Sequence, residues 1–216
     1  MKKIQSVSLT LCLIFISSLA SASSVYTYSF EQDSNNGNID ISDQLSMAVH
    51  DDGKQAIFTF YNDVGTNSSI AQVYFDDSTI PLFSEIGFYE QSAGVLFDQN
   101  GSNGNFGGPS FDTTFTSKKE KNMTNGVDHR NEWVRFFGLY NHGYTFDDLI
   151  SSIEDKNFNT GLHVISIDQA LIIDDPDKSE KFLLSSRIPN VPLPAAIWFF
   201  APALLGFLGF RRKNKV

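Results

Sequence analysis

Histidine is the side chain best suited to bind a metal or transfer a proton near neutral pH, so the four histidines are the first candidates for chemistry. They are His50, His129, His142 and His163. None belongs to a His-x-x-x-His or His-Glu-x-x-His pair, the spacing that places two ligands on one helix face. His163 alternates with Leu162 and Val164, which predicts a strand with the histidine on its polar face. We interpret all four as surface or strand-edge residues.

Two acidic segments could instead bind a divalent cation. Within residues 33–40 (DSNNGNID), counting from Asp33 puts Gly37 at the fifth position, where a calcium loop needs a ligand and not the glycine of its sixth position. Shifting the frame puts Gln32 first and removes the bidentate acid. This segment therefore predicts an Asx turn. Residues 174–177 (DDPD) hold three carboxylates in a loop, a pattern that favours solvated side chains over a bound ion.

Motifs for phosphate binding and nucleophilic catalysis are missing from the sequence. The Gly-rich residues 101–108 lack the GxGxxG spacing at a helix start, and no GxSxG elbow occurs. Paired carboxylates could hydrolyse a glycosidic bond, but nothing distinguishes two of the 25 acidic residues from the others. The sequence therefore predicts no catalytic residue, no cofactor and no metal ligand.

Charge is distributed unevenly along the 216 residues. Six of the 16 basic residues lie in two terminal segments that contain no acidic residue: Lys2, Lys3, Arg211, Arg212, Lys213 and Lys215. The remainder has ten basic and 25 acidic residues, a net charge of −15. Such a domain repels nucleic acid and anionic lipid, so we exclude nucleic acid as a partner. The negative charge is typical of a domain that stays soluble outside the cell.

The N-terminus has the parts of a secretory signal peptide in their usual order. Two lysines are followed by an apolar run at residues 7–19 and by small residues that include Ala20, Ala22 and Ser23. We predict export by the Sec machinery and cleavage by signal peptidase before Ser23. The apolar run is shorter than the roughly 20 residues that span a bilayer. The only cysteine, Cys12, lies inside this segment, so the mature protein is predicted to have no disulfide.

The C-terminus combines a short motif, an apolar stretch and a basic end. The motif residues are Val191, Pro192, Leu193, Pro194 and Ala195, and the basic residues are Arg211, Arg212 and Lys213. The apolar residues 195–210 would make a helix of about 24 Å, shorter than the roughly 30 Å of a bilayer's hydrocarbon layer. The basic cluster favours a cytoplasmic end. We therefore predict a marginal, single-pass helix in the inner membrane.

This arrangement resembles the PEP-CTERM sorting signal of Gram-negative bacteria, with Leu193 in place of the glutamate of the Pro-Glu-Pro motif. The resemblance covers residues 191–216. It implies recognition by exosortase, a membrane-embedded transpeptidase, with cleavage near the motif in a cell that makes exopolysaccharide. The processed protein would then reach the cell surface or the extracellular matrix. The alternative is an ordinary tail anchor, which would not need the Pro-x-Pro motif.

Between the signal peptide (residues 1–22) and the sorting segment (191–216), residues 23–190 are predicted to form one extracytoplasmic domain. Alternating apolar and polar residues predict strands at 25–31, 45–49, 56–60, 70–76, 82–90, 111–116, 132–139, 161–167 and 182–185. Residues 117–131 are predicted to be an exposed loop. Apolar residues at helical spacing after Thr145 predict one short helix at 146–153.

The expected fold is therefore all-β: an antiparallel, jelly-roll-like β-sandwich with one short helix, flanked by an N-terminal signal helix and a C-terminal transmembrane helix. Residues 58–62, 68–77 and 161–164 resemble a recurrent ectodomain of PEP-CTERM proteins. That resemblance implies no activity and no functional residues.

Three classes of function stay open. The first is a non-catalytic surface or matrix protein that exosortase processes and that is held among exopolysaccharide. The second is a carbohydrate-binding module, which would need an exposed row of aromatic side chains such as Tyr26, Tyr28 or Tyr74. The third is a glycan hydrolase or lyase, which would need a cleft with two facing carboxylates or a Tyr/His pair.

Overall fold

The computed structural model describes residues 24–33, 40–99, 106, 109, 111–120, 123–167 and 179–188. The signal peptide, the sorting segment and acidic residues 174–177 lie outside these ranges, as does most of the Gly-rich segment. A search of the described helices for one with the length and apolar character of a membrane span finds none.

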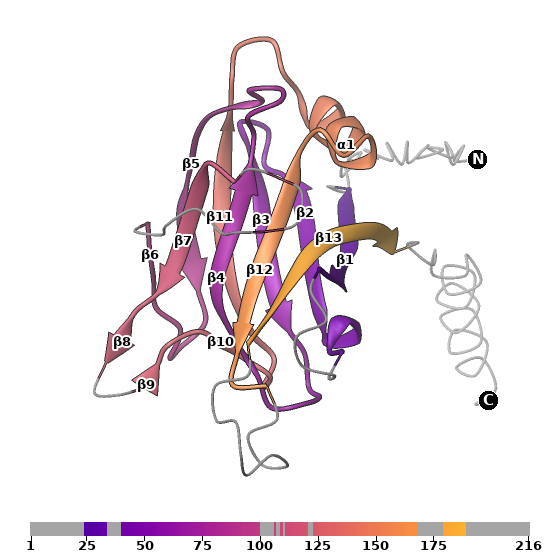
Figure 1. The fold of residues 1–216 in the computed structure, drawn as a ribbon. Helices are drawn as coiled ribbons and strands as arrows, with labels where there is room; N and C mark the ends of the chain where they lie inside the picture. The colour runs from indigo at the N-terminus through magenta and orange to yellow at the C-terminus, as the bar shows by residue number, and fades with distance from the viewer. Residues whose placement is uncertain are drawn as a thin grey trace, which may run out of the picture.

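The described residues are mostly antiparallel strands (Figure 1). The strands are β1 Val25–Gln32, β2 Leu45–Asp51, β3 Gln55–Asn62, β4 Ser69–Asp76, β5 Phe83–Gln91, β6 Phe97–Asp98, β7 Thr113–Ser117, β8 Lys119–Glu120, β9 Met123–Thr124, β10 Val127–Asp128, β11 Glu132–Tyr140, β12 Asn159–Ile165 and β13 Glu180–Ile188. A 3₁₀ turn, η1 (Ser42–Gln44), and one α-helix, α1 (Phe146–Glu154), complete the described elements. These assignments confirm the all-β class and the short helix.

One continuous sheet contains most of the strands, in the order β5-β11-β3-β2-β1-β13-β12-β4-β7-β6, with β10 added beside β4. β8 and β9 form a separate hairpin. The sheet curls, so that its end strands β5 and β6 lie near each other. Residues 92–96 connect these two strands, and the Phe97 amide of β6 donates to Gln91 Oε1 of β5 at 3.2 Å. The prediction was a two-sheet sandwich, whereas the hydrogen-bonded path is nearly closed and barrel-like.

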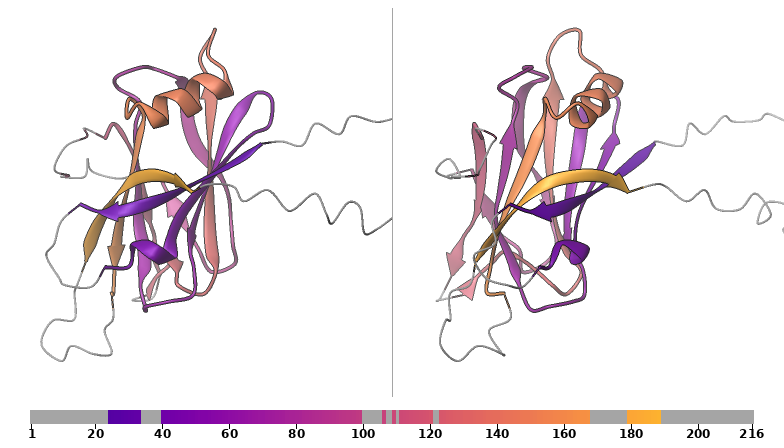
Figure 2. Two further views of the ribbon diagram at one scale, coloured as in Figure 1. Left: turned by 90° about the vertical axis from the view of Figure 1, so that its right-hand side faces the viewer. Right: turned by 45° about the vertical axis from the view of Figure 1, so that its right-hand side comes forward.

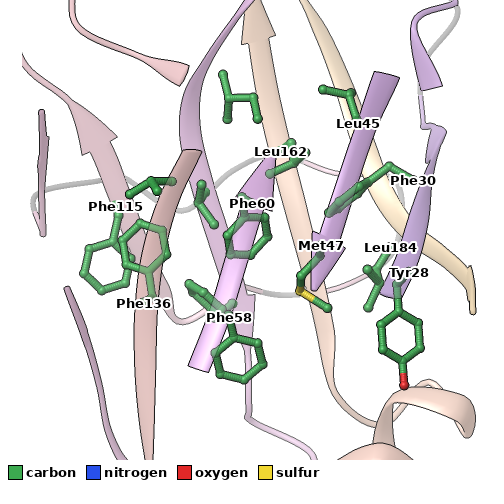
Figure 3. Packing of buried hydrophobic residues seen from close by; sticks show 14 of the residues in the cluster. Tyr28, Phe30, Leu45, Met47, Phe58, Phe60, Phe115, Phe136, Leu162 and Leu184 are labelled. Atoms are coloured by element: carbon green, nitrogen blue, oxygen red, sulfur yellow. The ribbon is translucent and has the colours of Figure 1, made fainter. Parts of the chain in front are cut away.

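Phenylalanine is the most frequent residue in the interior of the curled sheet (Figure 3). Phe58 and Phe60 project inward from β3, and Phe75 and Phe136 project inward from β4 and β11; all four are fully buried. Phe75 meets Phe136 at 5.6 Å between ring centroids in an edge-to-face arrangement. Such contacts add to the burial of apolar area, which is the main stabilising term of the domain.

The segment at 117–131 corrects a prediction. The sequence indicated an exposed loop, but the segment contains the short strands β8, β9 and β10. Val127 of β10 pairs with Ile70 of β4 and is completely buried. Because polar residues surround Val127 in the sequence, the alternation pattern gives no sign that its side chain faces inward.

Local hydrogen bonds determine where helix α1 begins and ends. Thr145 is its N-cap: its hydroxyl accepts from the Asp148 amide, and the Asp148 carboxylate accepts from the Thr145 amide at 2.8 Å. This reciprocal pair is a capping box. At the other end Lys156 adopts a left-handed conformation with φ 58°, and the Asn157 amide donates to the Ser152 carbonyl at 2.8 Å. The predicted helix at 146–153 is confirmed.

Candidate functional site

The most distinctive feature of the sheet is a split between β12 and β13. The first part of β13 pairs with β12, from Glu180 opposite Val164 to Leu183 opposite Gly161. Beyond that point β13 is paired only with β1, and the first residues of β12 pair only with β4. Figure 2 shows β13 curving away from β12 alongside β1, with α1 above them. The two strands therefore diverge next to the C-terminal end of α1.

A groove follows this split, and we call it the β13 groove. It consists of two adjoining hollows, of about 510 Å³ and about 290 Å³, which share Glu31 and Lys156. The larger hollow also contacts Asp76, Asn159, Leu183 and Leu184. The smaller hollow also contacts Tyr28, Ile153, Glu154 and Arg187. The volume of the larger hollow is in the range of small-ligand sites, which run from about 300 to 1,000 Å³, and the smaller hollow lies just below that range.

Tyr28 is the buried polar residue of the groove. Its side chain is only 1% exposed, and its hydroxyl has no hydrogen-bond partner among the described residues. The hydroxyl points toward α1 (Figure 3). Burial, together with the nearby Glu154 carboxylate, raises the pKa of Tyr28 to about 12, against the opposing effect of the Arg187 guanidinium. Because the hydroxyl keeps its proton at neutral pH, it is a donor from which no described residue accepts.

Lys156 contributes an ammonium group from a position that normally selects glycine. Its φ of 58° is the left-handed conformation of a helix C′ residue, which costs a residue with a side chain about 1 kcal/mol. Its amide donates to the Ile153 carbonyl at 3.1 Å, which fixes the backbone at this point. Lys156 takes part in none of the ion pairs found between described residues. Its charge is therefore available to a ligand in either hollow.

Arg187 is held in place on two sides. Its guanidinium lies 4.0 Å from the ring centroid of Tyr26, a cation–π contact. Its Nη1 also lies 3.5 Å from Glu154 Oε1 on α1. Since the groups are exposed, this ion pair adds little stability. It fixes instead where one positive and one negative charge sit at the edge of the smaller hollow.

Two further carboxylates complete the groove. Glu31 is exposed and accepts a hydrogen bond from the Ser185 hydroxyl at 3.1 Å. Asp76 is 5% exposed, and its carboxylate accepts from the Ser78 amide at 3.1 Å and from the Ser78 hydroxyl. The groove thus offers carboxylate acceptors and ammonium, guanidinium and phenol donors within one surface. Leu183, Leu184 and Ile153 supply its apolar part.

The four histidines lie away from the groove. His50 and His163 are half-buried, and burial lowers the pKa of both imidazoles. His163 Nδ1 lies 3.0 Å from Gln72 Oε1, which occupies that ring nitrogen. His142 is exposed. Within the described ranges no three His, Cys, Asp or Glu side chains are grouped so as to hold a metal ion.

Two of the three tyrosines that could have formed the aromatic row of a carbohydrate-binding module are buried. Tyr28 and Tyr74 are 1% and 3% exposed, so neither presents a ring to a flat ligand. The Tyr74 hydroxyl is used internally, donating to Gln72 Oε1. Tyr26 is half-buried, and Arg187 covers one face of its ring. A carbohydrate-binding platform of these three tyrosines is therefore not present.

The sequence patterns do not distinguish Glu31, Lys156 or Arg187 as functional residues. Lys156 alone could have been noticed, because it follows the predicted helix at the position where glycine is usual. The residues of the signal cleavage site and of the sorting motif lie outside the described residues. Comparison with family models, with curated proteins and with solved structures gives no match to this chain.

Proposed function

We propose that this chain is an exported, exosortase-processed protein of the cell surface or extracellular matrix, non-catalytic and associated with exopolysaccharide. The signal peptide and the sorting segment support this proposal from the sequence. Their residues enclose a folded domain that starts at Val25 and ends at Ile188, so little chain separates the domain from either processing segment.

The observation that carries the proposal is the pairing of the first and last strands. β1 and β13 are neighbours, with Thr27 opposite Ile188. Both ends of the domain therefore leave it at one place (Figure 2). The six residues 189–194 reach at most about 21 Å, so a helix at 195–210 would hold the domain close to the membrane until exosortase cleaves near Pro192–Pro194.

The proposed topology places Arg211, Arg212 and Lys213 in the cytoplasm and the acidic domain outside the inner membrane. We also propose that the facing halves of the curled sheet correspond to the two layers of a jelly-roll-like sandwich. The contact between Phe75 of β4 and Phe136 of β11, which are distant in the strand order, supports that correspondence.

Mass spectrometry of the C-terminus tests the sorting proposal. Cells with exosortase should yield a chain that ends near residues 192–194, and cells without it should retain Arg211–Lys213. Replacing Pro192 and Pro194 by alanine should give the intact tail in both strains. If the unmodified chain kept its tail in both strains, the C-terminal segment would be an ordinary membrane anchor and not a sorting signal.

A further inference from the structure

We propose that the β13 groove is a binding site for a neutral glycan chain, whose hydroxyls contact Tyr28, Lys156 and Glu31. The inference deepens the proposed function, because it names the part of the domain that would hold a matrix polymer. It rests on the geometry of the groove and not on the sorting segment.

The charges in the groove select the class of ligand. Glu31, Asp76 and Glu154 are negative, and Lys156 and Arg187 are positive. A polyanion would meet three carboxylates and a domain of net charge −15, and a basic peptide would meet the two cations. A sugar hydroxyl both donates and accepts, so it can bind a carboxylate and an ammonium at once. Mixed, closely spaced donors and acceptors therefore favour a neutral polyhydroxylated chain.

Tyr28 supplies the second, independent indication of a ligand. Tyr28 lines the smaller hollow, and its buried hydroxyl has no hydrogen-bond partner in the described chain. Buried polar groups in folded proteins are nearly always paired. An acceptor that enters the hollow beside α1 would complete the hydrogen bonding of this phenol.

Lys156 adds a third indication because its backbone favours glycine while its side chain lines both hollows. The apolar residues Leu183 and Leu184 of β13 line the same hollow as Lys156. A pyranose ring has C–H groups for the leucines and hydroxyls for the lysine. The two adjoining hollows thus suit successive sugar units of one chain.

Binding should be measured by isothermal titration of the full chain, purified in detergent from cells that lack exosortase. The probes are neutral oligosaccharides, namely β-1,4-glucan, β-1,3-glucan, mannan and galactan fragments, and one anionic oligosaccharide, oligoalginate. We expect at least one neutral probe to bind and the anionic probe not to bind. Replacing Tyr28→Phe and Lys156→Gly should each weaken binding about tenfold, the change that the loss of one good hydrogen bond to a ligand gives.

Both variants are chosen because folding should tolerate them. Tyr28→Phe removes an unpaired hydroxyl, and Lys156→Gly relieves a left-handed conformation, so neither should lower the melting temperature. Asn131→Gly is the matched control, since Asn131 also has a positive φ, of 62°, but does not line the groove. It should leave glycan binding unchanged. Tyr74→Phe, a buried tyrosine whose hydroxyl is paired, is the control for Tyr28.

Each other outcome is informative. Failure of all the neutral probes to bind, or binding by both groove variants as tight as that of the unmodified chain, would overturn the glycan site but leave exosortase processing intact. Preference for oligoalginate would overturn the choice of ligand class. Release of reducing ends from a bound probe would show cleavage and contradict the non-catalytic function itself. An unprocessed tail together with the expected glycan binding would contradict exosortase processing and support the glycan site.

Discussion

Asp77 is the buried carboxylate with the clearest structural task. It lies just after β4, is 8% exposed, and accepts the Leu82 and Phe83 amides at 2.9 Å each, one on each carboxylate oxygen. Burial raises the pKa of Asp77 from 3.8 to about 6, against the opposing effect of these two hydrogen bonds. At the residue scale, one acidic side chain thus closes the β4–β5 connection and also makes it sensitive to pH.

The sign of that sensitivity follows from proton linkage. Between about pH 4 and pH 6 the folded state holds a proton on Asp77 that the unfolded state has released. The contribution of Asp77 to the free energy of unfolding therefore falls as pH rises through this window, by at most about 1.4 kcal/mol per pH unit. Asp77→Asn cannot titrate and should lack this fall, whatever its effect on absolute stability. Urea unfolding from pH 4 to pH 7 measures the two slopes, and parallel curves would refute the assignment.

At the scale of single elements, α1 determines where the β13 groove lies. Its C-terminal end places Ile153 and Glu154 on one side of the split. Its buried residues, among them Leu149 and Ile153, attach it to the core. A nine-residue helix is too short to be stable by itself, so its position depends on this packing and on its N-terminal capping box.

Replacing the N-cap tests that dependence. Thr145→Ala removes the hydroxyl that accepts from the Asp148 amide and should lower the free energy of unfolding by about 1 kcal/mol. Ser151→Ala, an exposed position of the same helix, should be neutral or slightly stabilising. Urea unfolding of both variants measures the difference. Equal stability of the two would mean that α1 does not depend on its cap.

At the scale of the whole molecule, aromatic packing joins strands that are far apart in the sheet order. Phe75 contacts the rings of Phe58, Phe60, Phe115, Phe136 and Phe158. These rings come from β3, β7, β11 and the segment before β12. Phe75 thus lies in the interior between strands that are far apart in the sheet order, and its loss would leave a cavity that no single strand can fill.

Phe75→Ala should therefore lower the free energy of unfolding by about 3 to 5 kcal/mol, because it combines lost burial with an unfilled cavity. Phe75→Leu should cost clearly less, since most of the volume is kept. Phe88→Ala, at a position 40% exposed on β5, is the control and should change stability far less. Chemical unfolding of the three variants provides the comparison. Similar losses for Phe75→Ala and Phe88→Ala would contradict the central position of Phe75.

The groove itself could not have been predicted from the sequence. Its residues come from β1, β4, β12, β13 and the end of α1, with Tyr28 and Arg187 separated by most of the domain. They meet only because β1 pairs with β13 and because β13 leaves β12 after Leu183. Strand pairing over such separations depends on the packing of the whole sheet, which local alternation does not encode.

By itself, the sequence determined the all-β class, most strand positions and the capped helix, because alternation and capping are local properties of neighbouring residues. The export and sorting segments remain predictions of the sequence alone. Only the tertiary structure decided that the sheet is continuous and curled, that Val127 is buried, and that Tyr28 is enclosed beside the groove. Each of these depends on which distant strands become neighbours, and burial is a property of that arrangement.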